Sequence, residues 1–138
     1  MCLLDSNAIA IIIKRLGPQA VETLKERTTL DLARYELGNV IWKECILSRI
    51  ISSEEAAKKA GGIAELMDIM KILRTETPHS LRETMKLATE LQITFYDATY
   101  LYHAKNEPPL VTEDNQLRIK AKQVNIKAIT VNQLLQTG

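Results

Sequence analysis

The chain is poor in several residue types that mark common classes of protein. Aromatic residues make up only 4% of its 138 residues, which argues against an aromatic stacking platform for single-stranded nucleic acid. Its two cysteines, Cys2 and Cys45, have neither the spacing of a metal site nor that of a disulfide framework. We therefore expect buried or free thiols in a reducing cytoplasm.

Long hydrophobic runs and an excess of charge are also missing. The apolar run from Ala8 to Ile13 is far too short to span a bilayer. An acid at position 5, with no basic segment before it, does not fit a secretory signal. With 18 basic and 17 acidic residues the net charge is +1, so any binding of nucleic acid must come from local patches. These features predict a cytoplasmic protein.

Familiar catalytic motifs are absent as well. The sequence has no Walker loop, no GxGxxG and no GxSxG, and no serine has a recognisable His/Asp partner arrangement. The histidines are His79 and His103. His103 follows Asp97 in the same expected helix but on a different face, so we interpret it as a surface or packing residue.

Short apolar runs alternate with helical patterns along a chain that is 46% hydrophobic, and we expect one domain over residues 1–138. The expected strands cover 2–4, 28–32, 110–112 and 126–130, with a short edge strand before 75 as an option. The expected helices cover 8–16, 18–26, a long region from 34, 53–73, 81–91, 96–106, 114–123 and 131–135. Strands separated by helices predict a three-layer α/β/α fold, in which helices flank a small, mostly parallel central sheet.

Capping residues mark the amino-terminal ends of two expected helices. Ser52 and Glu55 form a capping box for the helix that follows, and Ser80 is the expected cap of helix 81–91. Gly61 and Gly62 interrupt the first of these helices at a cost of about 1 kcal/mol per glycine. We favour a helix break there, with close helix–helix contact at a dimer interface as the alternative.

Four acidic residues lie in or beside apolar segments: Asp5, Glu36, Asp97 and Asp114. Asp5 and Asp114 follow expected strands, and ligands bind at the edge where the carboxyl ends of parallel strands meet. Two carboxylates 4 Å apart repel by about 4 kcal/mol at an effective dielectric of 20, so converging acids require raised pKa values or a bound cation. Oxygen ligands favour Mg²⁺ or Mn²⁺ over zinc.

Each acid also has a simpler interpretation. Asp5, Asp97 and Asp114 all precede expected helices, where Asp is a common N-cap worth about 1 kcal/mol. Glu36 would then be a solvated helix residue, and the protein a non-catalytic interaction module. Capping does not explain why acids on different elements would face one edge.

The segments that carry these acids resemble the PIN-domain family, in particular the VapC-type toxin ribonucleases. Residues 3–8 are similar to the opening strand with the first acid, 35–40 to the helix with the second, 96–100 to a Tyr-Asp-Ala segment with the third, and 110–114 to a strand ending in Thr-x-Asp with the fourth. The resemblance covers nearly the whole chain. Asn115 and Gln116 depart from the pattern of relatives that have a further acid there, which would leave a second metal weakly held.

The resemblance implies a metal-dependent endoribonuclease that hydrolyses RNA phosphodiester bonds with a metal-activated water. It also implies a homodimer that is held inactive by a cognate VapB-like antitoxin. The four acids would hold Mg²⁺ (or Mn²⁺), while Ser6, Asn7 and Thr112 would orient ligands or water through hydrogen bonds. The candidate RNA-binding residues are Arg118, Lys120, Lys122 and, more weakly, Arg34 and Lys43.

Other enzymes use a similar layout. An RNA-processing or RNA-maturation nuclease that lacks an antitoxin would share both fold and metal. A phosphotransfer domain also places an Asp after the first strand, but the haloacid-dehalogenase type requires Asp-x-Asp where this chain has Asp5-Ser6-Asn7.

Overall fold

One five-stranded parallel sheet organises the computed structural model of the protein, which describes residues 2–137. The strands are β1 (Leu3–Leu4), β2 (Thr28–Leu30), β3 (Lys71–Leu73), β4 (Leu110–Val111) and β5 (Ala128–Ile129). The helices are α1 (Ser6–Leu16), α2 (Ala20–Leu24) after a 3₁₀ turn at Gly17–Gln19, α3 (Leu32–Ile46), α4 (Ser53–Ile69), α5 (Pro78–Leu91), α6 (Phe95–Ala104), α7 (Asn115–Gln123) and α8 (Val131–Thr137).

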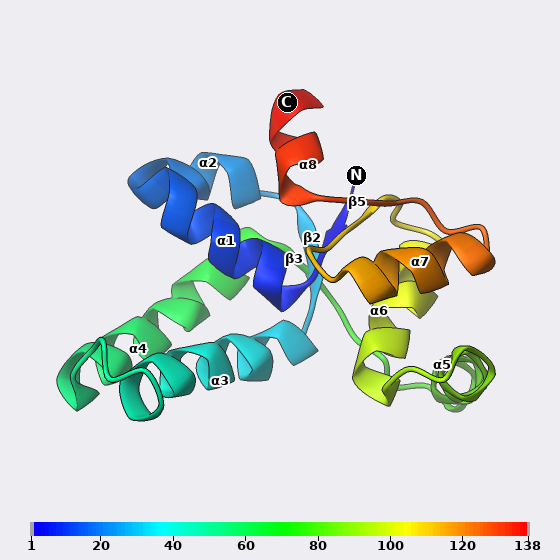
Figure 1. Ribbon diagram of the computed structural model, residues 1–138, viewed down its shortest axis with the longest axis horizontal. Coiled ribbons are helices and arrows are strands. Elements are labelled where there is room, and N and C mark those ends of the chain that lie inside the picture. Colours follow the sequence, from blue (N-terminus) through cyan, green and yellow to red (C-terminus); the bar gives the residue numbers. More distant parts are fainter. Residues whose placement is uncertain (1, 138) are drawn as a thin grey trace.

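Helices cover both faces of the sheet, which confirms the predicted three-layer α/β/α fold. In Figure 1, α1 to α4 lie on one side of the strands and α5 to α7 on the other. Successive strand residues point to opposite faces. Leu4 and Val111 accordingly enter one hydrophobic core, and their neighbours Leu3 and Leu110 enter the other.

The strand order β3-β2-β1-β4-β5 reverses its direction of growth between β1 and β4. In parallel α/β sheets a crevice opens at this point, beyond the carboxyl ends of the two strands. Leu4 pairs with Val111, and the Asp5 N–H donates to the Val111 carbonyl over 3.2 Å. The residues that follow β1 and β4 are therefore held opposite each other at the crevice.

Two expectations about α4 were wrong. The helix continues through Gly61 and Gly62 to Ile69, so there is no helix break, and the helical pattern does not reach Leu73. The capping box of Ser52 and Glu55 is present and fixes the first turn. Residues 71–73 instead form the edge strand β3, which pairs with β2.

The start of α5 also differs from the prediction. Thr77, not Ser80, is the N-cap, and Pro78 occupies the first turn, where its fixed φ and missing N–H are tolerated. The Ser80 hydroxyl accepts the Thr77 N–H at 3.1 Å, so Ser80 completes the capping box from inside the helix.

Gly61 offers a direct test of helix stability. A Cβ added there would meet no atom within 4 Å, so Gly61→Ala is expected to raise the free energy of unfolding by about 0.5–1 kcal/mol. Gly17→Ala is the matched control, because Gly17 has φ +54° and alanine is strained there. Urea denaturation should show opposite signs for the two variants, and a destabilised Gly61→Ala would contradict the uninterrupted helix.

Among residues 2–137, no helix has both the length and the apolar character needed to cross a membrane.

Candidate active site

Asp5 lies directly after β1 and is only 7% exposed. Its Oδ1 accepts the Ala8 N–H at 2.8 Å, so Asp5 is the N-cap of α1. The buried Thr112 hydroxyl donates to the Asp5 carboxylate and accepts the Asp114 N–H at 3.1 Å. Thr112 therefore links the acids that follow β1 and β4.

Asp114 is exposed and is the N-cap of α7, where it accepts the Leu117 N–H at 3.1 Å. Its neighbour Glu113 points elsewhere, as predicted, because its Oε1 accepts the Val131 N–H at 2.7 Å. Of these two acids, only Asp114 is directed to the crevice side of β4.

Asp97 is not a helix cap, which corrects that interpretation. It lies in the first turn of α6, whose N-cap is Thr94, and its own N–H donates to the Thr94 hydroxyl at 3.1 Å. The amino-terminal turns of α1, α6 and α7 thus each carry one of the acids. A helix amino terminus bears partial positive charge and favours anions, so it stabilises carboxylates or phosphate groups placed there.

Glu36, on α3, is held by Tyr100 of α6. The Tyr100 O–H donates to Glu36 Oε1 over 2.6 Å, and the Tyr100 oxygen accepts the Ser6 N–H. Sequence reasoning missed this tyrosine. Its one available signal is that it lies one helical turn after Asp97, on the same face of α6.

Burial and the charges of the neighbouring acids change the ionisation of Asp5 and Asp97. Burial, together with the charges of Glu36 and Asp97, raises the pKa of Asp5 to about 6, although the hydrogen bonds from Thr112 and Ala8 lower it. Burial also raises the pKa of Asp97, followed by the charges of Asp114 and Glu36. Burial and the Glu36 charge raise the pKa of Tyr100, which keeps its hydroxyl a donor. All four predicted acids are therefore coupled at one edge of the sheet.

The donor chemistry of this edge fits a hard divalent cation. Every candidate ligand is a carboxylate, and such oxygens suit Mg²⁺ or Mn²⁺. No three His, Cys, Asp or Glu side chains within residues 2–137 are already close enough to hold one ion directly. Mg²⁺ commonly binds through one or two carboxylates and keeps several waters, so an open arrangement is compatible with it.

The expected RNA-binding residues lie in different settings. Arg118 turns back to donate to the Thr112 carbonyl at 2.8 Å, and Lys122 is exposed on the same helix. Lys120 is half-buried on α7. Arg34 pairs with Asp31 at 3.1 Å, and the same carboxylate lies 3.4 Å from Arg74, so the two arginines share one neutralising charge.

The residues expected to orient ligands lie at the start of α1 and the end of β4. Ser6 is buried, and Thr112 makes the two contacts described above. Asn7 is exposed and lines a hollow of about 550 Å³ beside Glu36. Away from the acids, His103 makes a 2.8 Å hydrogen bond with Thr75, which confirms it as a packing residue.

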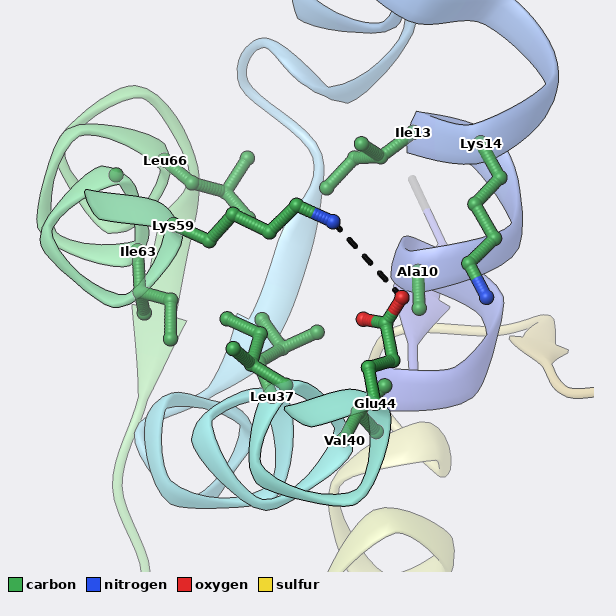
Figure 2. Close-up of a pocket in the computed structure, with 11 residues that line it drawn as sticks. Ala10, Ile13, Lys14, Leu37, Val40, Glu44, Lys59, Ile63 and Leu66 are labelled. Carbon is green, nitrogen blue, oxygen red and sulfur yellow. Dashed lines mark ion pairs between the residues drawn. The ribbon is translucent and has the colours of Figure 1, made fainter. Parts of the chain in front are cut away.

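A second hollow, of about 290 Å³, lies away from the acids between α1, α3 and α4 (Figure 2). Its lining is mostly apolar, with Ile13, Leu37 and Leu66 among the side chains. The ion pair between Glu44 and Lys59, 3.8 Å apart, joins α3 to α4 across it.

The fold, the strand order and the coupled acids together define a PIN-like protein. No family model matches the chain. The chain is 37% identical over 121 residues to "Exonuclease VapC9" of Pyrobaculum aerophilum, an alignment that covers 87% of this chain and 85% of that protein. It is 33% identical over 128 residues to "Ribonuclease VapC3" of the same organism, covering 86% and 92%. The crystal structure of PAE2754 from Pyrobaculum aerophilum matches with a TM-score of 0.76 and 31% identity, covering 99% of this chain and 93% of that one. The chain belongs to the VapC family of PIN-domain proteins.

Proposed function

We propose that the protein is a metal-dependent endoribonuclease and the toxin of a VapBC-type pair. The observation that carries the proposal is the proximity of Asp5, Glu36, Asp97 and Asp114 at the β1/β4 crevice, where burial and the charges of neighbouring acids raise the pKa values of Asp5 and Asp97. The names of the relatives, an exonuclease and a ribonuclease, support action on nucleic acid.

The four carboxylates would hold Mg²⁺ or Mn²⁺, which when bound supplies an activated water and offsets phosphodiester charge. Thr112 fixes the Asp5 carboxylate, and Tyr100 fixes Glu36. The amino-terminal turns of α1, α6 and α7 add partial positive charge for the substrate phosphate. The protein's part is thus to position acids and phosphate before the reaction begins.

Tyr100→Phe tests the positioning of Glu36. The ring and its packing remain, but the 2.6 Å hydrogen bond to Glu36 is lost. We expect about 10-fold weaker binding of Mn²⁺, since residues that orient metal ligands typically contribute 10–100-fold. Calorimetric titration of Mn²⁺ measures this without a cleavage assay. Tyr102→Phe, two positions further along the same helix, is the control and should bind Mn²⁺ as the wild type does.

A closed circular RNA distinguishes the proposed endonuclease from the exonuclease activity named for the first relative, because a circle has no end to degrade. We expect linearised product with Mn²⁺ or Mg²⁺, none with EDTA, and none from Asp97→Asn. Cleavage in EDTA would refute the metal requirement. Degradation of linear RNA alone, with the circle intact, would favour an exonuclease.

The partner is proposed to be a VapB-like antitoxin. The apolar hollow between α1, α3 and α4 continues into one of about 260 Å³, since both are lined by Ile13, Gly62 and Leu66. An extended apolar channel of this kind suits the apolar face of a partner helix. A short reading frame immediately upstream should encode a protein that co-purifies with this chain and blocks cleavage. If no such reading frame is found, an RNA-processing nuclease becomes the better proposal for the function.

We also propose that the protein forms a homodimer, which analytical sedimentation would measure.

A further inference from the structure

Two hollows adjoin near Glu36, and the same two tyrosines line both. One is the 550 Å³ hollow that contains Glu36, Asn39 and Lys43. The other, of about 270 Å³, contains Asp31, Arg74 and Phe95. Tyr35 and Tyr96 belong to both linings, so the two hollows adjoin at these side chains, and we call the pair of hollows the groove.

These tyrosines are unusually open to solvent. Tyr35 is 70% exposed and Tyr96 61% exposed, although each directly precedes one of the acids in the sequence. They come from α3 and α6, two helices that Tyr100 joins through Glu36. Exposed aromatic rings at a site that handles phosphodiesters provide faces on which bases stack.

Positive charge lies in both parts of the groove. Lys43 lines the first hollow and Arg74 the second. Arg74 lies 3.4 Å from Asp31, which also pairs with Arg34, and more than half of the Arg74 side chain remains exposed. The linings also contain the acids Glu36, Asp31 and Glu76. Lys43 and Arg74 are therefore single contacts for backbone phosphates and not a broad basic surface.

We propose that Tyr35 and Tyr96 form a stacking site for two unpaired nucleobases of the RNA substrate, with Lys43 and Arg74 contacting the flanking phosphates. This inference rests on the proposed function and specifies how the substrate binds. Only unpaired bases expose their faces, so the groove selects single-stranded segments. The low aromatic content gave no sign of such a site, because stacking depends on where the few rings lie.

The test uses an RNA oligonucleotide with 2-aminopurine, whose fluorescence is quenched when it stacks. Tyr35→Ala and Tyr96→Ala are each expected to raise KM by about 10-fold, with kcat changed less than about threefold, and to reduce the quenching. The phenylalanine variants keep the ring and should restore quenching. Trp42→Ala is the matched control, because Trp42 is an aromatic residue on α3 that is 50% exposed and lies outside the lining of both hollows.

The possible outcomes distinguish a failure of the stacking site from a failure of the proposed nuclease function. If the wild type cleaves RNA with metal but both alanine variants keep its KM and quenching, the stacking site is refuted and the nuclease stands. If the wild type neither binds nor cleaves RNA, the proposed function fails and the inference with it. If either alanine variant changes the sedimentation coefficient, the tyrosines lie in a contact between copies of the chain, and the inference is overturned.

Discussion

Asp5→Asn is expected to reduce RNA cleavage by at least about 100-fold and to make the metal-free protein more stable. Asparagine keeps the oxygen that accepts the Ala8 N–H, and it caps helices as well as aspartate does, so α1 should form normally. What the change removes is one negative charge from the crevice. Activity should fall because Asp5 is a proposed metal ligand, and even the residues that orient metal ligands typically contribute 10- to 100-fold.

The gain in stability follows from the raised pKa of Asp5. In the unfolded chain this carboxyl has its ordinary pKa of 3.8, and in the folded protein its pKa is about 6 because burial disfavours the charged form. The folded state is therefore favoured by protonation, an advantage that is complete below pH 3.8 and is lost as the pH rises through about 6. A shift of this size corresponds to at most about 3 kcal/mol, since one pKa unit is about 1.4 kcal/mol.

Chemical denaturation in EDTA measures this effect. At pH 7.5 the free energy of unfolding of Asp5→Asn should exceed that of the wild type by about 1–3 kcal/mol, and the difference should shrink toward pH 4.5. Asp68→Asn is the control, because it removes the same charge from an exposed position on α4. Equal stability of Asp5→Asn and wild type at pH 7.5 would contradict an unneutralised buried charge.

The sequence predicts best what depends on local order along the chain. Asp5 and Asp114 each follow a strand and cap a helix. Because the carboxyl ends of parallel strands lie at the same edge of the sheet, this local pattern is enough to place both acids at that edge. The capping box at Ser52 is equally local and is also present.

Length limits what apolar patterns reveal. Ile63, Leu66 and Met70 continue one helical stripe that Leu73 extends, yet residues 71–73 form a strand. Short apolar runs do not distinguish strand from buried helix, and here pairing with β2 decides the outcome. At Gly61 and Gly62 a helix forms where the sequence predicts a break. Their low helix propensity is outweighed by the packing of the residues around them in the same helix.

Contacts between residues far apart in the chain could not be predicted from the sequence. Glu36 and Tyr100 are 64 positions apart, and only the packing of α3 against the crevice brings them within hydrogen-bond distance. Tyr35 and Tyr96 come together in the same way. A low count of aromatic residues predicts no stacking platform, but composition carries no information on which of the few rings are exposed, as Tyr35 and Tyr96 are.

Adding Mn²⁺ at about 100 times its Kd is expected to stabilise the protein by about 2.7 kcal/mol. For a chain of this length that corresponds to a rise in Tm of about 10 °C. The physical reason is the same unneutralised charge: Asp5 and Asp97 already have raised pKa values because of burial and of the neighbouring acids, and a cation removes that repulsion. Since no three described side chains form a ready-made cage, the titration should extend into the millimolar range.

Thermal denaturation with increasing MnCl₂, matched in ionic strength with NaCl, separates specific binding from screening. NaCl alone should move Tm little, because screening acts mainly on exposed charges and Asp5 is buried. Asp5→Asn lacks one of the buried negative charges, so it should lose most of the rise in Tm that Mn²⁺ causes. Asp68→Asn should keep that rise. If the Tm of the wild type changes with neither Mn²⁺ nor EDTA, Asp5 and Asp114 act only as helix caps. The protein would then be an interaction module built on a nuclease fold.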